Sequence, residues 1–295
     1  MTTESARDPV DELRLTFWGV GGTRPVSGVD RVRYGGQTSC VSLRLPNDTL
    51  FVFDAGSGLS GLSDQLTRSR TTSRLTLLVS HPHLDHVVGF PFLDALYDTA
   101  WTIEICGAPT GGVTTRDVLA GLMDGVRFPV TLQELGARLT FTDMTQGRYL
   151  IAGIEVHTIE LQHRGTCLGY RVMHDGRSCC YVTDNELFLP SAPQHDPQRV
   201  AGLRAFVRDT DVLIIDATHS DHDYPAKVGQ GHSGVGQVCE LAHTAGAKTL
   251  CLFHHDPTQT DRDIDAKLTD AEKHLEALSS STRCLAPAEG DSVCF

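Results

Sequence analysis

The sequence predicts an α/β fold in which two mixed β-sheets pack against each other and helices cover their outer faces. The chain divides into two loosely similar halves, each with strand-like segments first and a helix afterwards. A chain of 295 residues with 40% apolar residues can bury a large core. Neither a low-complexity linker nor a fixed-period repeat interrupts the pattern, so we predict one domain over residues 13–295 after a polar leader at residues 1–12.

Apolar runs and turn residues predict the elements of the first half in order. A glycine-rich loop follows the first strand, and Pro46-Asn47-Asp48 forms the turn of a hairpin between the second and the third. The fourth strand is rich in Leu and Val, as buried strands are. The predicted strands span residues 13–18, 40–45, 50–54, 75–80, 102–106 and 138–142, and the predicted helix spans residues 58–68.

The second half alternates strands and helices more regularly. Asp175-Gly176 is a strong hairpin signal between two of its strands. Segments 110–131 and 185–209 are predicted to be loops that build the walls of a pocket. The predicted strands span residues 154–160, 168–173, 178–183, 212–216 and 249–253 with a short closing strand, and the predicted helices span residues 234–245 and 261–278.

Charge and cysteine usage limit the classes of function. The formal net charge of −12 disfavours long nucleic acids, which need Lys and Arg to displace counterions, but bound dications can still attract a small phosphate ester. The first dozen residues have no apolar run, so we expect a cytoplasmic protein that does not enter a membrane.

Nine cysteines without a CxxC spacing are expected to be reduced and mostly buried. The adjacent pair Cys179 and Cys180 leaves open a vicinal disulfide or a third metal site.

The decisive segment is a buried strand at residues 77–80 that runs directly into His81, His83, Asp85 and His86. In extended backbone His81 and His83 project to the same side, so they can share one ion. Asp85 and His86 are expected in the first turn of a helix that continues towards Leu96, where they can face a neighbouring ion. Imidazole and carboxylate ligands favour zinc, manganese or iron over calcium and magnesium.

Isolated histidines are interpreted more simply, as hydrogen-bonded core or surface residues. This interpretation applies to His157, His174, His195, His222, His243 and His274.

The HxHxDH spacing of these four residues resembles the signature of the metallo-β-lactamase superfamily, whose fold is an αβ/βα sandwich. Two further ligands stand where the superfamily supplies them, His163 in Leu-Gln-His-Arg-Gly and Asp184 in Tyr-Val-Thr-Asp-Asn. A last histidine is expected after the strand at residues 249–253, which ends in His254 and His255. Counting from the Gly-His-Ser segment favours His254.

Three segments resemble the branch that contains ribonuclease Z and small cyclic-phosphate phosphodiesterases. They are residues 17–23 (FWGVGGT), 212–218 (VLIIDAT) and 231–233 (GHS). Gly234 stands where this branch has Thr, and no long Gly/Pro-rich arm of the kind that grips transfer RNA is evident, so a role in tRNA processing is disfavoured. The resemblance is compatible with a homodimer.

Carried over residue by residue, the resemblance implies two divalent metal ions. One is held by His81, His83 and His163, the other by Asp85, His86 and His254, and Asp184 bridges them. Water between the ions is driven towards hydroxide and attacks the substrate. Asp85 and His232 are the candidate catalytic residues: His232 would bind a phosphate oxygen or protonate the leaving group, or else simply begin a helix.

Other residues are candidates for support or substrate contact. His255 is an alternate ligand or a neighbour of the ligands, and Asp54 and Asp216 either orient ligand histidines or cap turns. The loop at residues 34–39, with Arg24 and Arg31 or Arg33, borders the substrate or is an ordinary surface loop, and Lys227 is a similar candidate.

The sequence therefore favours a metal-dependent phosphodiesterase acting on a small or cyclic phosphodiester, such as a cyclic nucleotide or a ribosyl cyclic phosphate. A thioester or lactone hydrolase on the same fold is the alternative. A non-catalytic metal-binding sensor is disfavoured because such a protein would usually lose ligands. A flavin-linked oxygen reductase is disfavoured because the sequence contains no flavodoxin-like domain.

Overall fold

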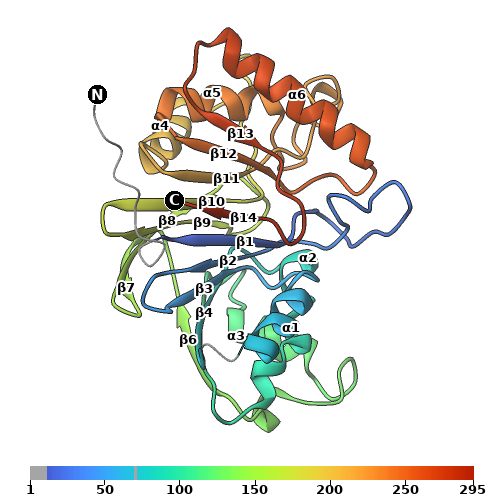
Figure 1. Ribbon diagram of the computed structural model, residues 1–295, viewed down its shortest axis with the longest axis vertical. Helices are drawn as coiled ribbons and strands as arrows, with labels where there is room; N and C mark the ends of the chain where they lie inside the picture. The colour runs from blue at the N-terminus through green and yellow to red at the C-terminus, as the bar shows by residue number, and fades with distance from the viewer. Residues whose placement is uncertain (1–11, 70–71) are drawn as a thin grey trace.

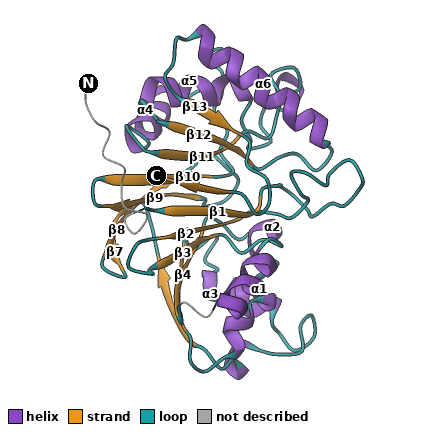
Figure 2. Ribbon diagram, in the orientation of Figure 1, coloured by secondary structure: helices purple, strands orange, loops and turns teal. Residues whose placement is uncertain are grey.

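The computed structural model describes residues 12–69 and 72–295, so of the predicted leader only Glu12 lies within the described part. Two seven-stranded sheets form from these residues, in the orders β14-β1-β2-β3-β4-β5-β6 and β13-β12-β11-β10-β9-β8-β7. They lie face to face in the middle of the molecule (Figures 1 and 2). The prediction of two mixed sheets with helices outside is thus confirmed, whereas the single domain over residues 13–295 stays a prediction.

The first sheet mixes antiparallel and parallel pairing. Its strands β14, β1, β2 and β3 pair antiparallel, and β3, β4, β5 and β6 pair parallel. The carboxyl ends of β3 and β4 therefore lie at one edge, where ligands gather in parallel sheets. The strands are β1 Arg14–Gly19, β2 Cys40–Arg44, β3 Leu50–Phe53, β4 Arg74–Val79, β5 Thr102–Gly107, β6 Arg138–Asp143 and β14 Ser292–Cys294.

The second sheet has the same mixture. Strands β7 to β10 pair antiparallel and β10 to β13 pair parallel. Asp175 and Gly176 both have positive φ, +47° and +74°, as the predicted tight hairpin requires. The strands are β7 Gly147–Ile151, β8 Ile154–Glu160, β9 Leu168–His174, β10 Arg177–Val182, β11 Val212–Asp216, β12 Thr249–Phe253 and β13 Arg283–Leu285.

Three apolar clusters hold the layers together. One lies between the sheets, around Phe17, Phe53 and Tyr181, and each of the others lies between one sheet and its helices. Helices α1 and α3 cover the first sheet, and α4, α5 and α6 cover the second (Figure 1). The helices are α1 Leu59–Ser69, α2 Leu84–Val87, α3 Thr115–Leu122, α4 Pro197–Phe206, α5 Val235–Ala245 and α6 Asp261–Ala277, with short 3-10 turns η2 Phe90–Phe92, η3 Asp94–Tyr97, η4 Leu132–Glu134 and η5 Tyr224–Ala226. Within residues 12–69 and 72–295 no helix combines the length and apolar character needed to cross a bilayer.

The helix predicted to run from Asp85 towards Leu96 is wrong in length. Helix α2 is a single turn, followed by the 3-10 turns η2 and η3. Pro91 lacks an N–H and restricts the residue before it, and the Gly89 N–H donates to the Ala55 carbonyl oxygen (2.8 Å) instead of continuing the helix. The short turn keeps Asp85 and His86 close to the end of β4.

Adjacent positions on β10 place Cys179 and Cys180 in different cores. Cys179 packs between the sheets, and Cys180 packs under the helices of the second sheet. Successive strand residues point to opposite faces, so the two sulfurs cannot pair or share a metal. The nine cysteines are free and eight are buried, as expected, with Cys294 exposed.

Candidate metal centre

His81 and His83 lie side by side where β4 ends. Their ring centroids are 4.4 Å apart, and His81 Nε2 lies 2.8 Å from His83 Nδ1. Extended backbone through Pro82 gives this arrangement because residues two apart share a side. His81 is buried, whereas His83 is exposed to the cleft described below.

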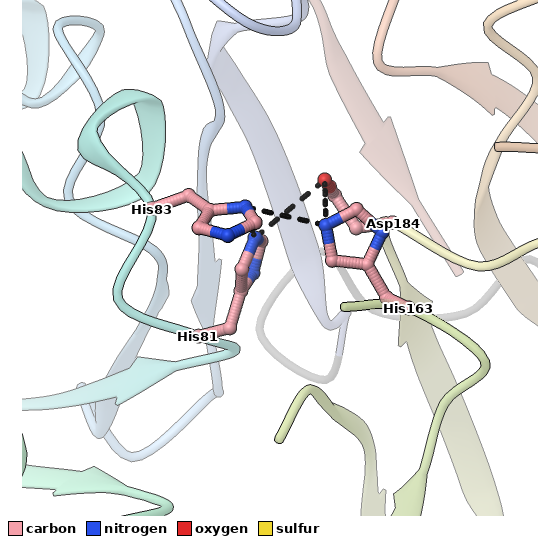
Figure 3. Close-up of side chains that lie close together, drawn as sticks. All are labelled: His81, His83, His163 and Asp184. Carbon is pink, nitrogen blue, oxygen red and sulfur yellow. Dashed lines mark hydrogen bonds and ion pairs between the residues drawn. The ribbon is translucent and has the colours of Figure 1, made fainter. Parts of the chain in front are cut away.

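The second sheet supplies two more donors to the same point. His163 follows β8 and Asp184 follows β10, and Figure 3 shows both facing the pair from β4. His163 Nε2 lies 3.2 Å from His83 Nδ1. Asp184 Oδ2 lies 3.6 Å from His81 Nε2 and 3.5 Å from His163 Nε2. Together the donor atoms of these four residues are close enough to hold one metal ion.

A second group of donors adjoins the first. It consists of Asp85 and His86 on α2 and of His254 directly after β12. Asp85 Oδ2 lies 3.2 Å from His86 Nε2 and 3.4 Å from His254 Nε2.

Asp184 connects the two groups through its two oxygens. Oδ2 faces the first group, whereas Oδ1 lies 3.2 Å from His86 Nε2 and 3.2 Å from His254 Nε2. The backbone of Asp184 has φ of +43°, which turns the buried side chain out of the line of β10. The geometry suits a carboxylate placed between two cations.

Asp54 orients His86. It is fully buried at the end of β3, and its Oδ2 accepts hydrogen bonds from His86 Nδ1 (2.7 Å) and the Tyr181 hydroxyl (2.8 Å). Ser80 binds both of its oxygens, through the backbone N–H and the hydroxyl. With Nδ1 fixed in this way, His86 presents Nε2 to the donor group.

Hydrogen bonds to the other ring nitrogens orient the remaining histidines similarly. His163 Nδ1 lies 3.0 Å from the Gly231 carbonyl oxygen, and His254 Nδ1 lies 3.0 Å from the Thr218 hydroxyl. Two glycines allow this close packing. A Cβ on Gly22 would lie 2.2 Å from the His254 ring, and a Cβ on Gly231 would lie 2.4 Å from the His163 ring.

The donor set fits divalent cations. His86 Nε2 is fully buried without a hydrogen-bond partner in the described part of the chain, so its lone pair is available to an ion. Burial lowers the pKa of His81, His83 and His163, which favours the neutral rings that bind metals. Burial opposes protonation of His86, yet the carboxylates of Asp184, Asp85 and Asp54 raise its pKa well above its ordinary value, so positive charge is favoured at this point.

His232 stands beside the second group. Its Nδ1 lies 2.7 Å from Asp216 Oδ2, and its ring stacks on His254 with centroids 4.8 Å apart. Burial opposes its protonation, but the charge and hydrogen bond of Asp216 raise its pKa to about 9. Asp216 is itself fixed by hydrogen bonds from the Thr218 N–H and hydroxyl. Asp216 therefore favours the protonated ring and holds Nδ1, which leaves Nε2 to other partners.

His255 points away from the donor atoms. Its ring is buried, meets the Tyr34 ring at its edge, and belongs to none of the donor groups. Between the two candidates for the last position, only His254 joins the group. Its φ of +59° turns the chain after β12 so that the two neighbouring histidines diverge.

Residues 49–255 match the family described as a beta-lactamase superfamily domain, and this range covers most of the chain. The chain belongs to the beta-lactamase superfamily. It is similar to ribonuclease Z of Methanosarcina acetivorans, with 26% identity over an alignment of 308 positions that covers 90% of this chain and 94% of the relative. The predicted resemblance and the prediction of a metal-dependent hydrolase are thereby confirmed.

Solved structures of this superfamily share the fold. The metallo-beta-lactamase fold protein YhfI of Bacillus subtilis superposes with a TM-score of 0.68 at 16% identity, over 97% of this chain and 100% of that one. A diphosphatase from the PhnP family superposes with a TM-score of 0.66 at 15% identity, over 96% and 97% of the two chains. Members of the superfamily generally use divalent metals, and the His/Asp cluster fits them.

The donor groups of this superfamily member open into a cleft of about 880 Å³. The residues that line this cleft include Asp85 and Asp184 together with His83, His163, His232 and His254. Of the two segments predicted to form walls, 185–209 contributes Glu186, Phe188 and Gln194, whereas 110–131 contributes nothing to this lining. Both segments were wrongly predicted to be loops throughout, because they contain α4 and α3.

Most of the basic residues suggested for substrate contact lie elsewhere. Arg33 binds the Asp265 carboxylate on α6, and Arg31 binds Asp30 and the Thr258 carbonyl oxygen. Lys227 is absent from the cleft lining. Arg24 and Gln37 instead line a second cavity that adjoins Asp85.

Two residues of the centre were missed in the sequence. Glu186 is buried beside the cleft and accepts hydrogen bonds from the Gly229 N–H (2.7 Å) and the Gly231 N–H (2.8 Å). His219 is buried with its ring centroid 6.0 Å from that of His232. The available signals were an acidic residue two positions after Asp184 and a histidine three positions after Asp216.

Proposed function

We propose that this chain hydrolyses a small or cyclic phosphodiester, such as a cyclic nucleotide or a ribosyl cyclic phosphate, with two divalent ions. Zinc is the first candidate, with manganese or iron as alternatives. His81, His83 and His163 would hold one ion, Asp85, His86 and His254 the other, and Asp184 would join them. The observation that carries the proposal is the pair of donor groups linked through Asp184, with the Asp216-bound His232 beside them.

When bound, the ions would supply a nucleophile from water and neutralise charge on the phosphate. The remaining work falls to side chains of this chain. Asp54 and Gly231 fix the rings of His86 and His163, so the donors are oriented before substrate arrives. Asp216 stabilises the protonated form of His232, which can donate its Nε2 proton to the leaving oxygen.

A phosphodiester is supported by the similarity to ribonuclease Z, whose name denotes cleavage of RNA. A small substrate is supported by the charge of the site. Among the described residues that line the cleft, Arg164 is the one arginine, no lysine is present, and the acids are Asp85, Asp184 and Glu186. Binding to a nucleic-acid polymer needs several cationic side chains along the path of the backbone, and its affinity falls steeply with salt. The net charge of −12 agrees with a substrate of few phosphates.

The proposal is tested by hydrolysis of bis(p-nitrophenyl) phosphate by the purified chain with added zinc or manganese. We expect turnover that a chelator abolishes. A lactone and a thioester serve as parallel substrates. Cleavage of either one without diester turnover would contradict the proposal in favour of the alternative hydrolase.

The role of His232 is tested by a comparison of leaving groups. p-Nitrophenolate leaves without taking up a proton, whereas the ribose alkoxide released when a 2′,3′-cyclic nucleotide is opened requires one. His232→Gln should therefore lower kcat for the cyclic nucleotide by about 10²–10⁴-fold and for the nitrophenyl ester far less. Equal losses on both substrates would assign His232 to binding and not to proton transfer.

A further inference from the structure

We propose that an apolar cavity next to Asp85 is the subsite for the nucleobase of the substrate. This inference rests on the proposed function and narrows its substrate class to phosphodiesters that carry a base. The cavity has a volume of about 380 Å³, which lies in the range of small-molecule sites.

The cavity is continuous with the metal centre. Thr23, Leu84 and Asp85 line both this cavity and the larger cleft. The Thr23 N–H donates to Asp85 Oδ2 at 2.6 Å, so the loop that forms one wall is attached to a metal-binding carboxylate. A phosphate at the donor groups would thus have its substituent next to this opening.

Two large apolar side chains line the cavity without being buried in the core. Leu84 is 61% exposed and Phe92 is 56% exposed, although their neighbours Asp85 and Pro91 are buried. The Phe92 ring is held edge-on by Phe128, with centroids 5.8 Å apart and an interplanar angle of 88°. Because Phe92 is 56% exposed, part of its ring surface remains available for stacking. Exposed apolar side chains gathered beside a polar centre are typical of a binding surface.

Polar groups in the same cavity favour a base over an acyl chain. Gln37, Ser57 and Ser60 add amide and hydroxyl groups to the lining, and Arg24 adds a guanidinium. The Ser57 hydroxyl already accepts from the Thr38 N–H, and the Ser60 hydroxyl already donates to the Ser57 carbonyl oxygen. An acyl chain would leave the Gln37 amide and the Arg24 guanidinium without partners, which costs free energy. A nucleobase presents a flat apolar face and hydrogen-bonding edges at once, and proteins bind bases by stacking combined with such contacts.

The test measures binding directly, so that it does not depend on turnover. The zinc-loaded chain is titrated calorimetrically with adenosine 5′-monophosphate and with ribose 5-phosphate, which has the same phosphate and sugar but no base. We expect the base to tighten binding of the wild-type chain by at least 10-fold, and Phe92→Ala to remove most of that preference. Phe92→Trp should retain it. Leu150→Ala, at a side chain 78% exposed on β7, is the matched control and should change nothing.

The outcomes separate the subsite from the proposed function. Equal affinities for the two ligands, or a base preference that Phe92→Ala leaves intact, would overturn the subsite. Tighter binding of hexanoate than of adenosine 5′-monophosphate would also overturn it and would identify an acyl pocket. The diester assay decides the proposed function separately, because it measures turnover of a substrate without a base by the wild-type chain.

Discussion

Asp184 is the residue on which both donor groups depend. One oxygen lies near His81 and His163, and the other lies near His86 and His254. A carboxylate in this position offsets positive charge in both donor groups and sets the distance between the two groups. The HxHxDH spacing alone identified four of the donors, because strand and turn geometry place them from sequence. Asp184 and His163 are more than 75 residues away in the chain, so they were predicted from the family resemblance and not from strand or turn geometry.

Replacement of Asp184 tests this residue. Asp184→Ala should lower the number of ions bound per chain by at least one, as measured by elemental analysis after dialysis against zinc. The matched control is Asp175→Ala, since Asp175 is also an aspartate with positive φ, +47° against +43°, but lies at a hairpin tip. If Asp184→Ala binds as many ions per chain as Asp175→Ala, Asp184 does not bridge two ions.

At the level of the element, the loop between η5 and α5 depends on Glu186. Two backbone N–H groups of this loop donate to the Glu186 carboxylate, and the Gly231 carbonyl oxygen in turn accepts from His163. The sequence did not reveal this contact, because Glu186 belongs to no motif and its partners are backbone atoms. A carboxylate that accepts several such bonds holds the loop in place, because charge-assisted hydrogen bonds are roughly twice as strong as neutral ones.

Glu186→Gln should loosen this loop. A hydrogen bond to a charged group contributes about 1.5–3 kcal/mol, so amide hydrogens of Gly229 and Gly231 should exchange roughly 10-fold faster or more, as measured by mass spectrometry. The control is Glu160→Gln at an exposed position of β8. Unchanged exchange in Glu186→Gln would show that other contacts hold the loop.

Helix α6 supports the other side of the centre through Lys267. This lysine is buried, and its Nζ donates to the Ala217 carbonyl oxygen (2.7 Å) and Gln259 Oε1 (2.8 Å). Burial lowers its pKa from 10.5 to about 7, against the opposing effect of Asp216, Asp256 and Asp263. Those carboxyls stay ionised above pH 7 because their own pKa values are lowered, and His255 stays neutral.

Lys267 therefore makes stability depend on pH between about 7 and 10.5. In this range the Lys267 amine is protonated more fully in the unfolded chain than in the folded chain. The free energy of unfolding should therefore rise with pH. Lys267→Met should remove this rise, which is at most on the order of 2 kcal/mol from pH 7 to 9, in urea titrations. Lys273→Met, at an exposed lysine on the same helix, should keep it. Parallel pH curves for wild type and Lys267→Met would contradict the shifted pKa.

Helices α3 and α4 and strand β7 escaped prediction for physical reasons. Helix α4 buries only Leu203 completely, so its sequence lacks an apolar stripe, although Asp196 and Pro197 mark a helix start. Helix α3 is short, and its signal was the capping box of Thr114 and Asp117. Strand β7 is an edge strand with alternate exposed residues. Long apolar strands and the longer amphipathic helices were predicted because burial imposes their period.

On the scale of the whole molecule, the metal centre joins the two sheets. His81, His83, Asp85 and His86 follow a strand of the first sheet, and His163, Asp184 and His254 follow strands of the second. The sequence predicted two mixed sheets and the positions of most strands along the chain. It could not predict how their edges meet, because that depends on packing between Phe17, Phe53, Tyr181 and Phe253 in the shared core.

Removal of metal should therefore weaken the whole fold and not only the site. Without cations the buried carboxylates of Asp54, Asp85 and Asp184 lack a dication to balance them. At metal concentrations 100-fold above the dissociation constant, binding contributes about 2.7 kcal/mol per site, so a chelator should lower Tm by roughly 5–10 °C. The measurement is thermal unfolding with and without chelator. Asp184→Ala should respond much less, and an identical Tm in both conditions would show that the centre does not stabilise the sheets.

The pairing of β14 with β1 has a consequence for synthesis on the ribosome. Thr16 pairs with Ser292 and Arg14 with Cys294, so the edge of the first sheet at β1 stays open until residues 292–294 have been translated. At about 5–20 residues per second, β1 waits roughly 15–55 s for its partner. During this interval an unpaired edge can recruit a neighbouring nascent chain on the same polysome. Slower translation should therefore lower the yield of folded protein unless a chaperone covers β1.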